Sequence, residues 1–143
     1  MEKSLHMLIY RIFHAQRNYL RPSLAKYGLG SGQPKILNYL SVHGACCQRE
    51  LAQFFEIDPA AISRMLESME KGGFISRSTD DVNRRADVIS ITEKGEDAYG
   101  RWREDCTAMQ EIMLRGFTEE EKRALSDSLL RIYANLSSAE SKG

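Results

Sequence analysis

Residues 57–73 read IDPAAISRMLESMEKGG, a stretch with a helix start, an amphipathic middle and a helix stop. Asp58 supplies a side-chain oxygen for the first free amides, and Pro59 is preorganised for the first helical position. The apolar positions repeat at helical spacing and form an inward stripe with Met65 at its margin: Ile62, Leu66 and Met69. The intervening positions face outward: Ala60, Ser63, Arg64 and Glu67. Gly72-Gly73 end the predicted helix.

The neighbouring segments complete a pattern. Before this helix, residues 48–55 predict a shorter one with an apolar face, and Glu56-Ile57 turn the chain. After it, residues 74–78 and 87–91 predict two strands. The loop between them is mostly polar and carries Asn83-Arg84-Arg85 at its tip. Two helices around a tight turn, followed by a hairpin, are the layout of a winged helix-turn-helix, which reads DNA.

This layout predicts which side chains contact DNA. The helix from Asp58 enters the major groove, where Ser63 and Arg64 make base and phosphate contacts. The hairpin tip places Arg85 in or over the minor groove. The expected DNA-binding set is Pro59, Ala60, Ser63, Arg64, Arg77, Arg84 and Arg85.

All four arginines of this set have alternative interpretations. Arg64 also suits a solvated helix position paired with Glu67. Arg84 and Arg85 also suit the tip of a soluble loop, and Arg77 equally suits bracing the hairpin.

The flanking segments indicate a dimer. Residues 4–20 predict a helix whose apolar face is broader than a small winged-helix core can cover, and Thr92 begins another that continues to Arg115. Thr118-Glu119-Glu120-Glu121 resembles a capping box that opens a last helix. The residues expected at the dimer interface are Leu5, Leu8, Ile12, Leu125, Leu129, Ile132 and Leu136. A two-fold dimer would present two recognition helices about one DNA turn apart. The alternative is packing on the same subunit.

The order and spacing of these motifs resemble the MarR family (multiple antibiotic resistance regulators). The resemblance rests on residues 28–33, 36–40, 51–52, 57–77, 83–85 and 91–95, and the helical flanks match in length. It implies a mostly helical single domain over 1–143, with a small β-hairpin wing in a DNA-binding lobe at 31–92 and dimerisation helices at 1–27 and 93–143. It also implies intertwined terminal helices and a small phenolic or other aromatic effector. Arg85 matches the family's wing arginine, while Asn83 replaces the usual aspartate.

Composition bounds the function. The 20 basic and 20 acidic residues give a net charge of zero, so we expect modest non-specific affinity for DNA. The first 27 positions contain five basic residues and one acidic residue, and we expect some of the basic ones to add to the protein surface that contacts the DNA backbone. No apolar run approaches a membrane span, and the N-terminus does not resemble a secretory signal. Three cysteines indicate a reducing compartment, so we expect a cytoplasmic protein.

The cysteines raise a redox hypothesis. Cys47 stands at the expected cap of helix 48–55, where the helix dipole favours a thiolate, and Cys46 lies beside it. The alternative is that buried cysteines act as small apolar residues, as expected for Cys106. His43, Cys46 and Cys47 lack the paired spacing of a structural zinc site, so no metal is expected.

No catalytic motif is present in the sequence. The three histidines have no nucleophile or carboxylate at a motif spacing, and glycine-rich residues 28–32 lack the lysine of a phosphate loop. We therefore expect neither an enzyme nor a cofactor. The sequence predicts a homodimeric transcription regulator of a pseudo-palindromic operator, more consistent with a repressor, released by a ligand or by oxidation. A winged-helix module that docks other proteins is the alternative.

Overall fold

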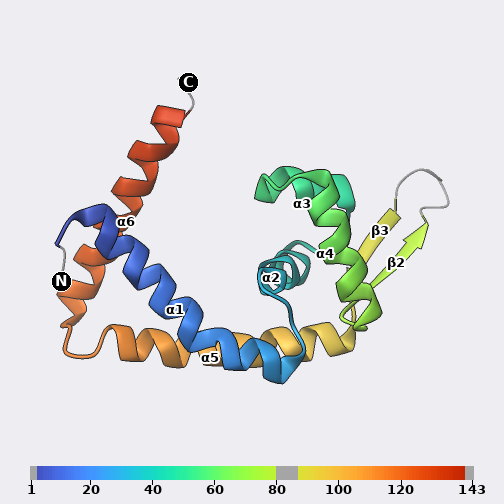
Figure 1. The fold of residues 1–143 in the computed structure, drawn as a ribbon, viewed down its shortest axis with the longest axis horizontal. Helices are drawn as coiled ribbons and strands as arrows, with labels where there is room; N and C mark the ends of the chain where they lie inside the picture. Colours follow the sequence, from blue (N-terminus) through green and yellow to red (C-terminus); the bar gives the residue numbers. More distant parts are fainter. Residues whose placement is uncertain (1–2, 80–86, 141–143) are drawn as a thin grey trace. The chain divides into compact units, whose positions relative to one another are not determined.

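The computed structural model describes residues 3–79 and 87–140, which form six helices and one three-stranded sheet (Figure 1). The helices are α1 (Leu5–Tyr27), α2 (Gln33–His43), α3 (Gln48–Phe55), α4 (Pro59–Lys71), α5 (Glu93–Met113) and α6 (Glu119–Glu140). The strands are β1 (Cys46–Cys47), β2 (Ile75–Thr79) and β3 (Asp87–Ile91). The mostly helical winged helix-turn-helix class is confirmed. The chain divides into two compact units, Met1–Thr107 and Ala108–Gly143, and the boundary between them lies within α5.

The core of the first unit is built from α2, α3, α4 and β3. Its largest fully buried side chains are Ile36, Leu37, Leu40, Leu51, Ile62, Leu66, Met69 and Ile89. The predicted stripe of α4 is therefore confirmed, and Met65 is half-buried at its margin as expected. Because this stripe faces inward, the opposite side of α4 faces solvent.

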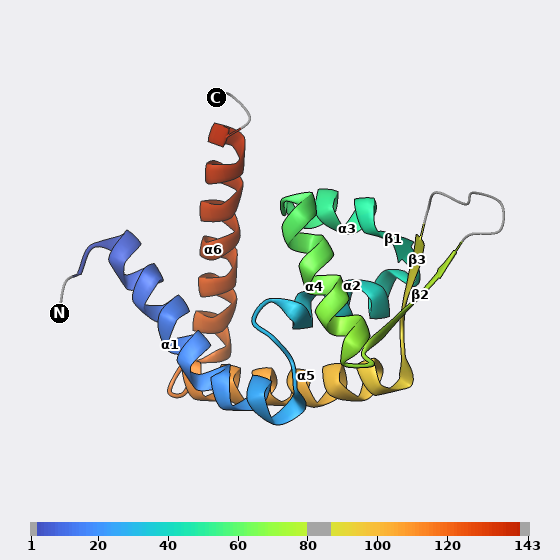
Figure 2. The ribbon, with the colours of Figure 1, turned by 45° about the vertical axis from the view of Figure 1, so that its right-hand side comes forward.

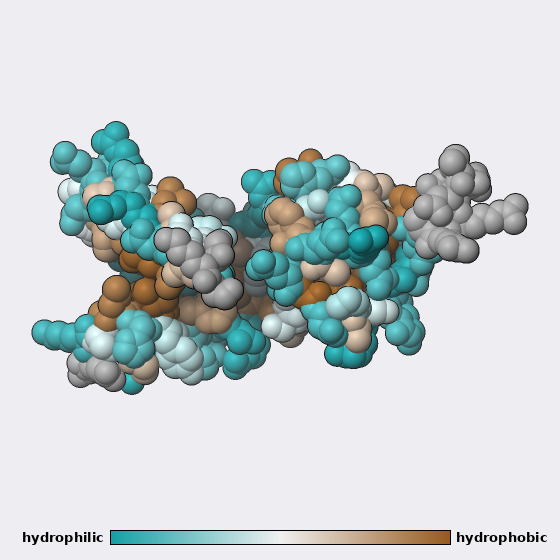
Figure 3. Space-filling view, turned by 90° about the horizontal axis from the view of Figure 1, so that it is seen from above, coloured by the Kyte–Doolittle hydropathy of each residue, from teal (hydrophilic) through white to brown (hydrophobic). Residues whose placement is uncertain are grey.

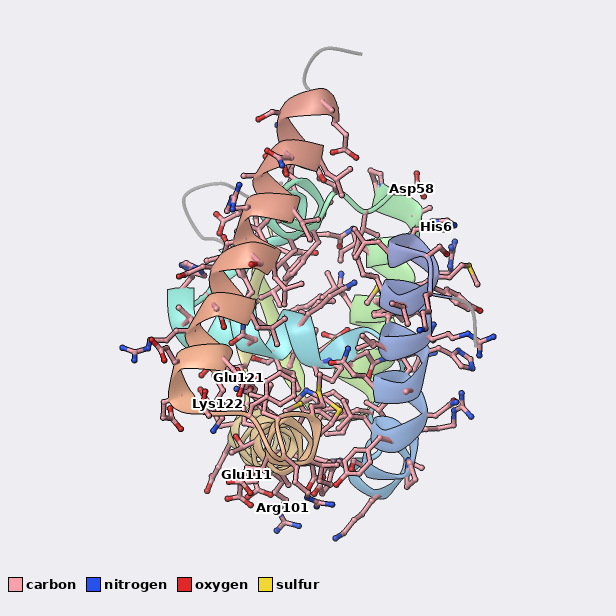
Figure 4. All side chains as sticks on the ribbon, turned by 90° about the vertical axis from the view of Figure 1, so that its left-hand side faces the viewer. His6, Asp58, Arg101, Glu111, Glu121 and Lys122 are labelled. Carbon is pink, nitrogen blue, oxygen red and sulfur yellow. The ribbon has the colours of Figure 1, made fainter. Side chains whose placement is uncertain are left out.

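The start of α4 is fixed by the predicted cap. The Asp58 carboxylate accepts hydrogen bonds from the amides of Ala60 and Ala61, at 3.1 and 3.3 Å. The turn before it places Glu56 in the left-handed region with φ of 53°, and the Ile57 amide donates to the Ala52 carbonyl. Figure 4 labels Asp58 beside the first turn of α4. These local bonds fix where the helix begins and its direction.

The sheet has the order β1-β3-β2 and is antiparallel throughout (Figure 2). Ile75 pairs with Ile91, and Thr79 pairs with Asp87 at the far end of the hairpin. Strand β2 begins one residue later than predicted, and β1 was not predicted. A two-residue strand has no alternation to detect, because its conformation comes from pairing with β3.

The end predicted for the first helix was wrong, since α1 continues past residue 20 to Tyr27. Pro22 lies inside α1 and removes one amide donor, while Leu24 and Tyr27 continue the apolar face that packs on the core. Gly28 ends the helix in the left-handed conformation with φ of 75°. The glycine at this position supplies a C-terminal cap without a Cβ clash.

The second unit contains the end of α5 and all of α6. The predicted capping box is present: the Thr118 amide donates to Glu121 at 3.0 Å, and the Glu121 amide donates to the Thr118 hydroxyl at 3.1 Å. These bonds lower the pKa of the Glu121 carboxyl. Helix α6 has no buried residue, and its apolar side chains contribute to the hydrophobic surface coloured brown in Figure 3. None of the helices in the described ranges combines the length and apolarity that crossing a bilayer requires.

The first turn of α5 passes very close to the backbone that joins α4 to β2. A Cβ atom on Gly95 would lie 2.2 Å from the Phe74 carbonyl oxygen and 2.8 Å from Cγ1 of Ile91. The Phe74 oxygen belongs to the backbone, so it cannot rotate away. Only glycine fits at position 95 with this geometry.

We predict that Gly95→Ala lowers the free energy of unfolding by about 3 kcal/mol, because the methyl group overpacks a backbone contact. Urea denaturation followed by circular dichroism measures this change. Gly100→Ala is the matched control: Gly100 lies in the same helix and a Cβ there meets nothing within 4 Å. It should be neutral or stabilising by up to about 1 kcal/mol. Equal effects of the two substitutions would contradict the close contact.

Candidate nucleic-acid interface

The outer face of α4 presents the residues predicted to read DNA. Pro59, Ala60 and Arg64 are exposed, and Ser63 is half-buried. Within the described ranges, Arg64 forms no ion pair or side-chain hydrogen bond, because Glu67 pairs instead with Lys71 at 3.4 Å. The alternative pairing of Arg64 with Glu67 is therefore absent. The Arg64 guanidinium has five donors available for a base edge or a phosphate.

Arg77 is placed differently from Arg64. Its side chain is only 21% exposed, and it lies 3.9 Å from a Glu70 oxygen and 3.8 Å from an Asp87 oxygen. Nη1 also donates to the Gln48 side chain at 3.4 Å. The Arg77 Nε atom is buried and has no hydrogen-bond partner in the described part of the chain. These contacts join β2 to α3, α4 and β3, which is the geometry of a brace.

The wing tip is not part of the described structure. Asn83, Arg84 and Arg85 lie in the gap between residues 79 and 87. The described strands show where the tip begins, because the hairpin projects from the body of the first unit in both ribbon views (Figures 1 and 2). The roles of Arg84 and Arg85 stay predictions.

The apolar residues predicted for a dimer interface are largely uncovered within one chain. Leu5, Ile12, Leu125, Leu129 and Leu136 are exposed, and Leu8 and Ile132 are half-buried. Further large apolar side chains share this exposure in both units: Ile9, Tyr10, Phe13, Leu130 and Tyr133. Exposed apolar surface on this scale typically marks an interaction site.

A pocket of about 940 Å³ lies between α1, α2 and α5 in the first unit, and the sequence did not identify the residues that line it. Its apolar walls include Phe13, Leu20 and Trp102. Among the described residues, four cationic side chains and no acidic one line it: Arg17, Arg21, Lys35 and Arg103. Two of the five basic residues in the first 27 positions, Arg17 and Arg21, line this pocket, whereas from the sequence we expected some of the five to contact the DNA backbone. The pocket suits an amphipathic anion.

Hydrogen bonds hold the pocket walls together. The Tyr27 hydroxyl donates to Asp105 at 2.8 Å, joining α1 to α5, and the Tyr99 hydroxyl donates to Asn38, joining α5 to α2. The bond to Asp105 raises the pKa of Tyr27. A hydrogen bond from Ser23 lowers the pKa of Asp105, and the hydrogen bond from Tyr27 has a smaller effect in the same direction. These hydrogen bonds therefore connect α5 to both α1 and α2.

The two adjacent cysteines occupy different environments. Cys46 is buried, and burial, with a smaller effect of Glu50, raises the pKa of its thiol to about 11. Cys47 is half-buried at the N-cap of α3, where its sulfur makes no capping hydrogen bond. Cys106 is half-buried, and burial raises the pKa of its thiol. Of the pair, Cys47 is the thiol better placed to react. Across the described residues, no group of three or more His, Cys, Asp or Glu side chains is arranged to hold a metal ion.

Comparison with known proteins gives a consistent result. The model of the MarR family matches residues 29–86. An uncharacterized HTH-type transcriptional regulator, YybA of Bacillus subtilis (strain 168), is 33% identical over 76% of this chain and 72% of its own length. The HTH-type transcriptional repressor MdtR of the same organism is 25% identical over 82% of this chain and 76% of its own.

Solved structures are also similar to this chain. The crystal structure of MarR has a TM-score of 0.83 and 25% identity, with coverage of 99% of this chain and 97% of its own. The crystal structure of the transcriptional regulator SlyA gives the same TM-score and identity, with 96% coverage of each chain. The matched family segment contains α4 and β2, the elements that carry Pro59, Ala60, Ser63, Arg64 and Arg77 of the predicted DNA-binding set.

Proposed function

Because this chain belongs to the MarR family of DNA-binding transcriptional regulators, we propose that it is a homodimeric repressor that binds a pseudo-palindromic operator in the cytoplasm. The observation that carries the proposal is Arg64, which is exposed and without an ion-pair partner among the described residues, on the outer face of α4. The similarity to a protein named as a repressor supports the direction of regulation.

In the proposed complex α4 lies in the major groove. Arg64 donates to a base edge or a phosphate, and Ser63 makes a second, shorter-range contact beside it. Arg85 enters the minor groove from the wing. Arg77 stays in the protein and braces β2 against α4, because its guanidinium already lies among Glu70, Asp87 and Gln48. Sequence specificity therefore depends mainly on α4.

A dimer would explain the exposed apolar surface of the chain and would suit a DNA operator. The exposed apolar side chains of α1 and α6 are best removed from water by a second copy of the chain. A two-fold dimer also presents two copies of α4 to successive major grooves, so the operator repeats as inverted half-sites. In this proposal Leu5, Leu8 and Ile12 join the α6 residues Leu125, Leu129, Ile132 and Leu136 at the interface.

We predict that Arg64→Ala weakens operator binding by about 2 kcal/mol, because a bidentate base or phosphate contact is lost. Arg85→Ala should also weaken it. Fluorescence anisotropy with a labelled operator, selected from genomic fragments, measures affinity at several salt concentrations. Sedimentation of the same mixtures should give two chains per operator.

Arg101→Ala is the matched control for the DNA contacts. Arg101 is an exposed cation on α5 that pairs with Asp97 at 3.3 Å, and it lies at the far side of the first unit from Asp58 (Figure 4). Its removal should leave operator affinity within twofold of the wild type. Absence of saturable, salt-dependent binding to any duplex would favour the protein-docking alternative instead.

We also propose that a small molecule bound in the pocket releases the protein from DNA. The pocket between α1, α2 and α5 combines apolar walls with four cationic side chains, so it favours an aromatic anion over a neutral aromatic. Such a ligand releases DNA only if it binds more tightly to a conformation whose recognition helices do not fit the operator.

We predict that 2-naphthoate weakens operator binding about tenfold at saturation, and that neutral 2-naphthamide has a smaller effect. Anisotropy titrations of the preformed complex with each compound measure the difference. Arg103→Gln should reduce the effect of the carboxylate and leave that of the amide unchanged, because only the anion needs the cation. Identical responses to both compounds would show that the pocket does not select charge.

Oxidation is a second route of release, and Cys47 is the residue that we assign to it. Oxidising Cys47 would change the junction where β1 ends and α3 begins. We predict that peroxide weakens operator binding by the wild type and that Cys47→Ser resists it. Cys46→Ser is the control, because the Cys46 thiol stays protonated at neutral pH and should therefore react little with peroxide. A peroxide titration in a gel-shift assay measures both, and equal responses of wild type and Cys47→Ser would end the hypothesis.

A further inference from the structure

The C-terminal end of α4 is held by side chains from the beginning of α5. The Lys94 Nζ atom donates to the Gly72 carbonyl at 2.6 Å, and the Thr92 hydroxyl donates to the Gly73 carbonyl at 2.6 Å. The Thr92 amide adds a backbone hydrogen bond to the Phe74 carbonyl at 3.1 Å. We call these contacts, together with Gly95 against Phe74, the α4–α5 clamp.

Lys94 makes two contacts in this clamp. Besides the Gly72 carbonyl, its ammonium lies 4.7 Å from the centre of the Phe74 ring, within the range of a cation–π interaction. The carbonyls at the end of a helix are the negative end of its dipole, so a cation there is favourable. The Lys94 ammonium therefore binds groups of the protein itself, although Lys94 is a cation on the lobe proposed to bind DNA.

The clamp acts where α4 ends in two consecutive glycines. Gly72 and Gly73 follow α4 in sequence, and Gly73 has φ of 83°. Two glycines in succession restrict the backbone very little, so without added contacts they form a natural pivot. The bonds from Lys94 and Thr92 bind the carbonyls of these two glycines, and Gly95 lets α5 approach Phe74 closely enough for both bonds to form.

A small rotation at this pivot would displace the DNA-reading side chains. Arg64 lies eight positions before Gly72, about 12 Å along the helix axis at 1.5 Å per residue. A tilt of about 10° would move its backbone by about 2 Å, whereas a good hydrogen bond tolerates about 0.5 Å. Loss of the clamp should therefore affect base reading before it affects folding.

We propose that Lys94 is a positioning residue for DNA recognition, which fixes the angle of α4 through the Gly72 carbonyl and does not itself contact a phosphate. This inference rests on the proposed function and assigns a new role within it. A positioning residue and a phosphate contact differ in one measurable respect. A lost phosphate contact lowers the slope of log affinity against log salt by about 0.9, while a misplaced helix leaves the number of neutralised phosphates unchanged.

The test compares Lys94→Met with wild type on the operator and on a random duplex of equal length, across salt concentrations. Lys94 is exposed, and methionine keeps an apolar side chain over Phe74, so the variant should fold. We expect operator affinity to fall about tenfold, with unchanged salt slope and unchanged affinity for the random duplex. Lys94→Arg, which restores a cationic donor, should recover most of the loss.

Arg101→Met is the matched control, because it removes a cation from the same helix that has no contact with α4 in the described structure. It should leave both duplexes unaffected. A salt slope reduced by about 0.9 in Lys94→Met, with both duplexes weakened equally, would make Lys94 a phosphate contact and overturn the proposal. Unchanged operator affinity would overturn it too.

A second measurement separates this inference from the proposed function. If the wild type binds no duplex, the DNA-binding proposal fails, and the clamp is then judged by amide hydrogen exchange in the full chain. The Gly73 and Phe74 amides donate to the Glu70 and Met69 carbonyls, both at 3.0 Å. Lys94→Met should speed their exchange several-fold, and Lys94→Arg should restore it. Unchanged exchange would show that Lys94 does not hold this end of α4.

Discussion

The close approach of α5 to the backbone of Phe74 is the constraint on which the first unit depends. Four elements meet there: α4 ends, β2 begins, and β3 passes into α5. Their relative directions are set by backbone atoms and short hydrogen bonds, which adjust less than side-chain packing does. The recognition helix therefore has two fixed ends, the Asp58 cap at one and the Phe74 junction at the other.

This arrangement explains how a chain of zero net charge suits DNA. The cationic side chains of this protein differ in whether they have partners within the protein. Arg77 lies between the Glu70 and Asp87 carboxylates, which offset its charge, and the Lys94 ammonium donates to a helix carbonyl. Arg64 has no such partner in the described structure and remains available. Net charge measures how strongly a protein attracts any duplex, whereas the placement of a few free donors decides which duplex it prefers.

Local signals predicted α4 almost completely, and non-local contacts explain what sequence reasoning missed. Asp58-Pro59, the apolar stripe and the two glycines all act within a few residues, so they can be detected directly. Strand β1 depends on pairing with β3, more than forty positions away. The role of Arg77 depends on α3 and β3, and the pocket walls come from helices far apart in the chain. Neither has a spacing that a single sequence reveals.

Helix α5 links the two activities that we propose. Its first turn holds the end of α4, and its next turns contribute Tyr99, Trp102 and Arg103 to the pocket. In the mechanism that we propose, a ligand that moves these pocket residues also moves the clamp and α4, because a helix is stiff over so short a distance. Thermodynamic linkage then requires reciprocity: if an anion weakens operator binding by a given factor, the operator weakens anion binding by the same factor. The clamp transmits the effect in both directions, since hydrogen bonds between α4 and α5 have no preferred direction of transfer.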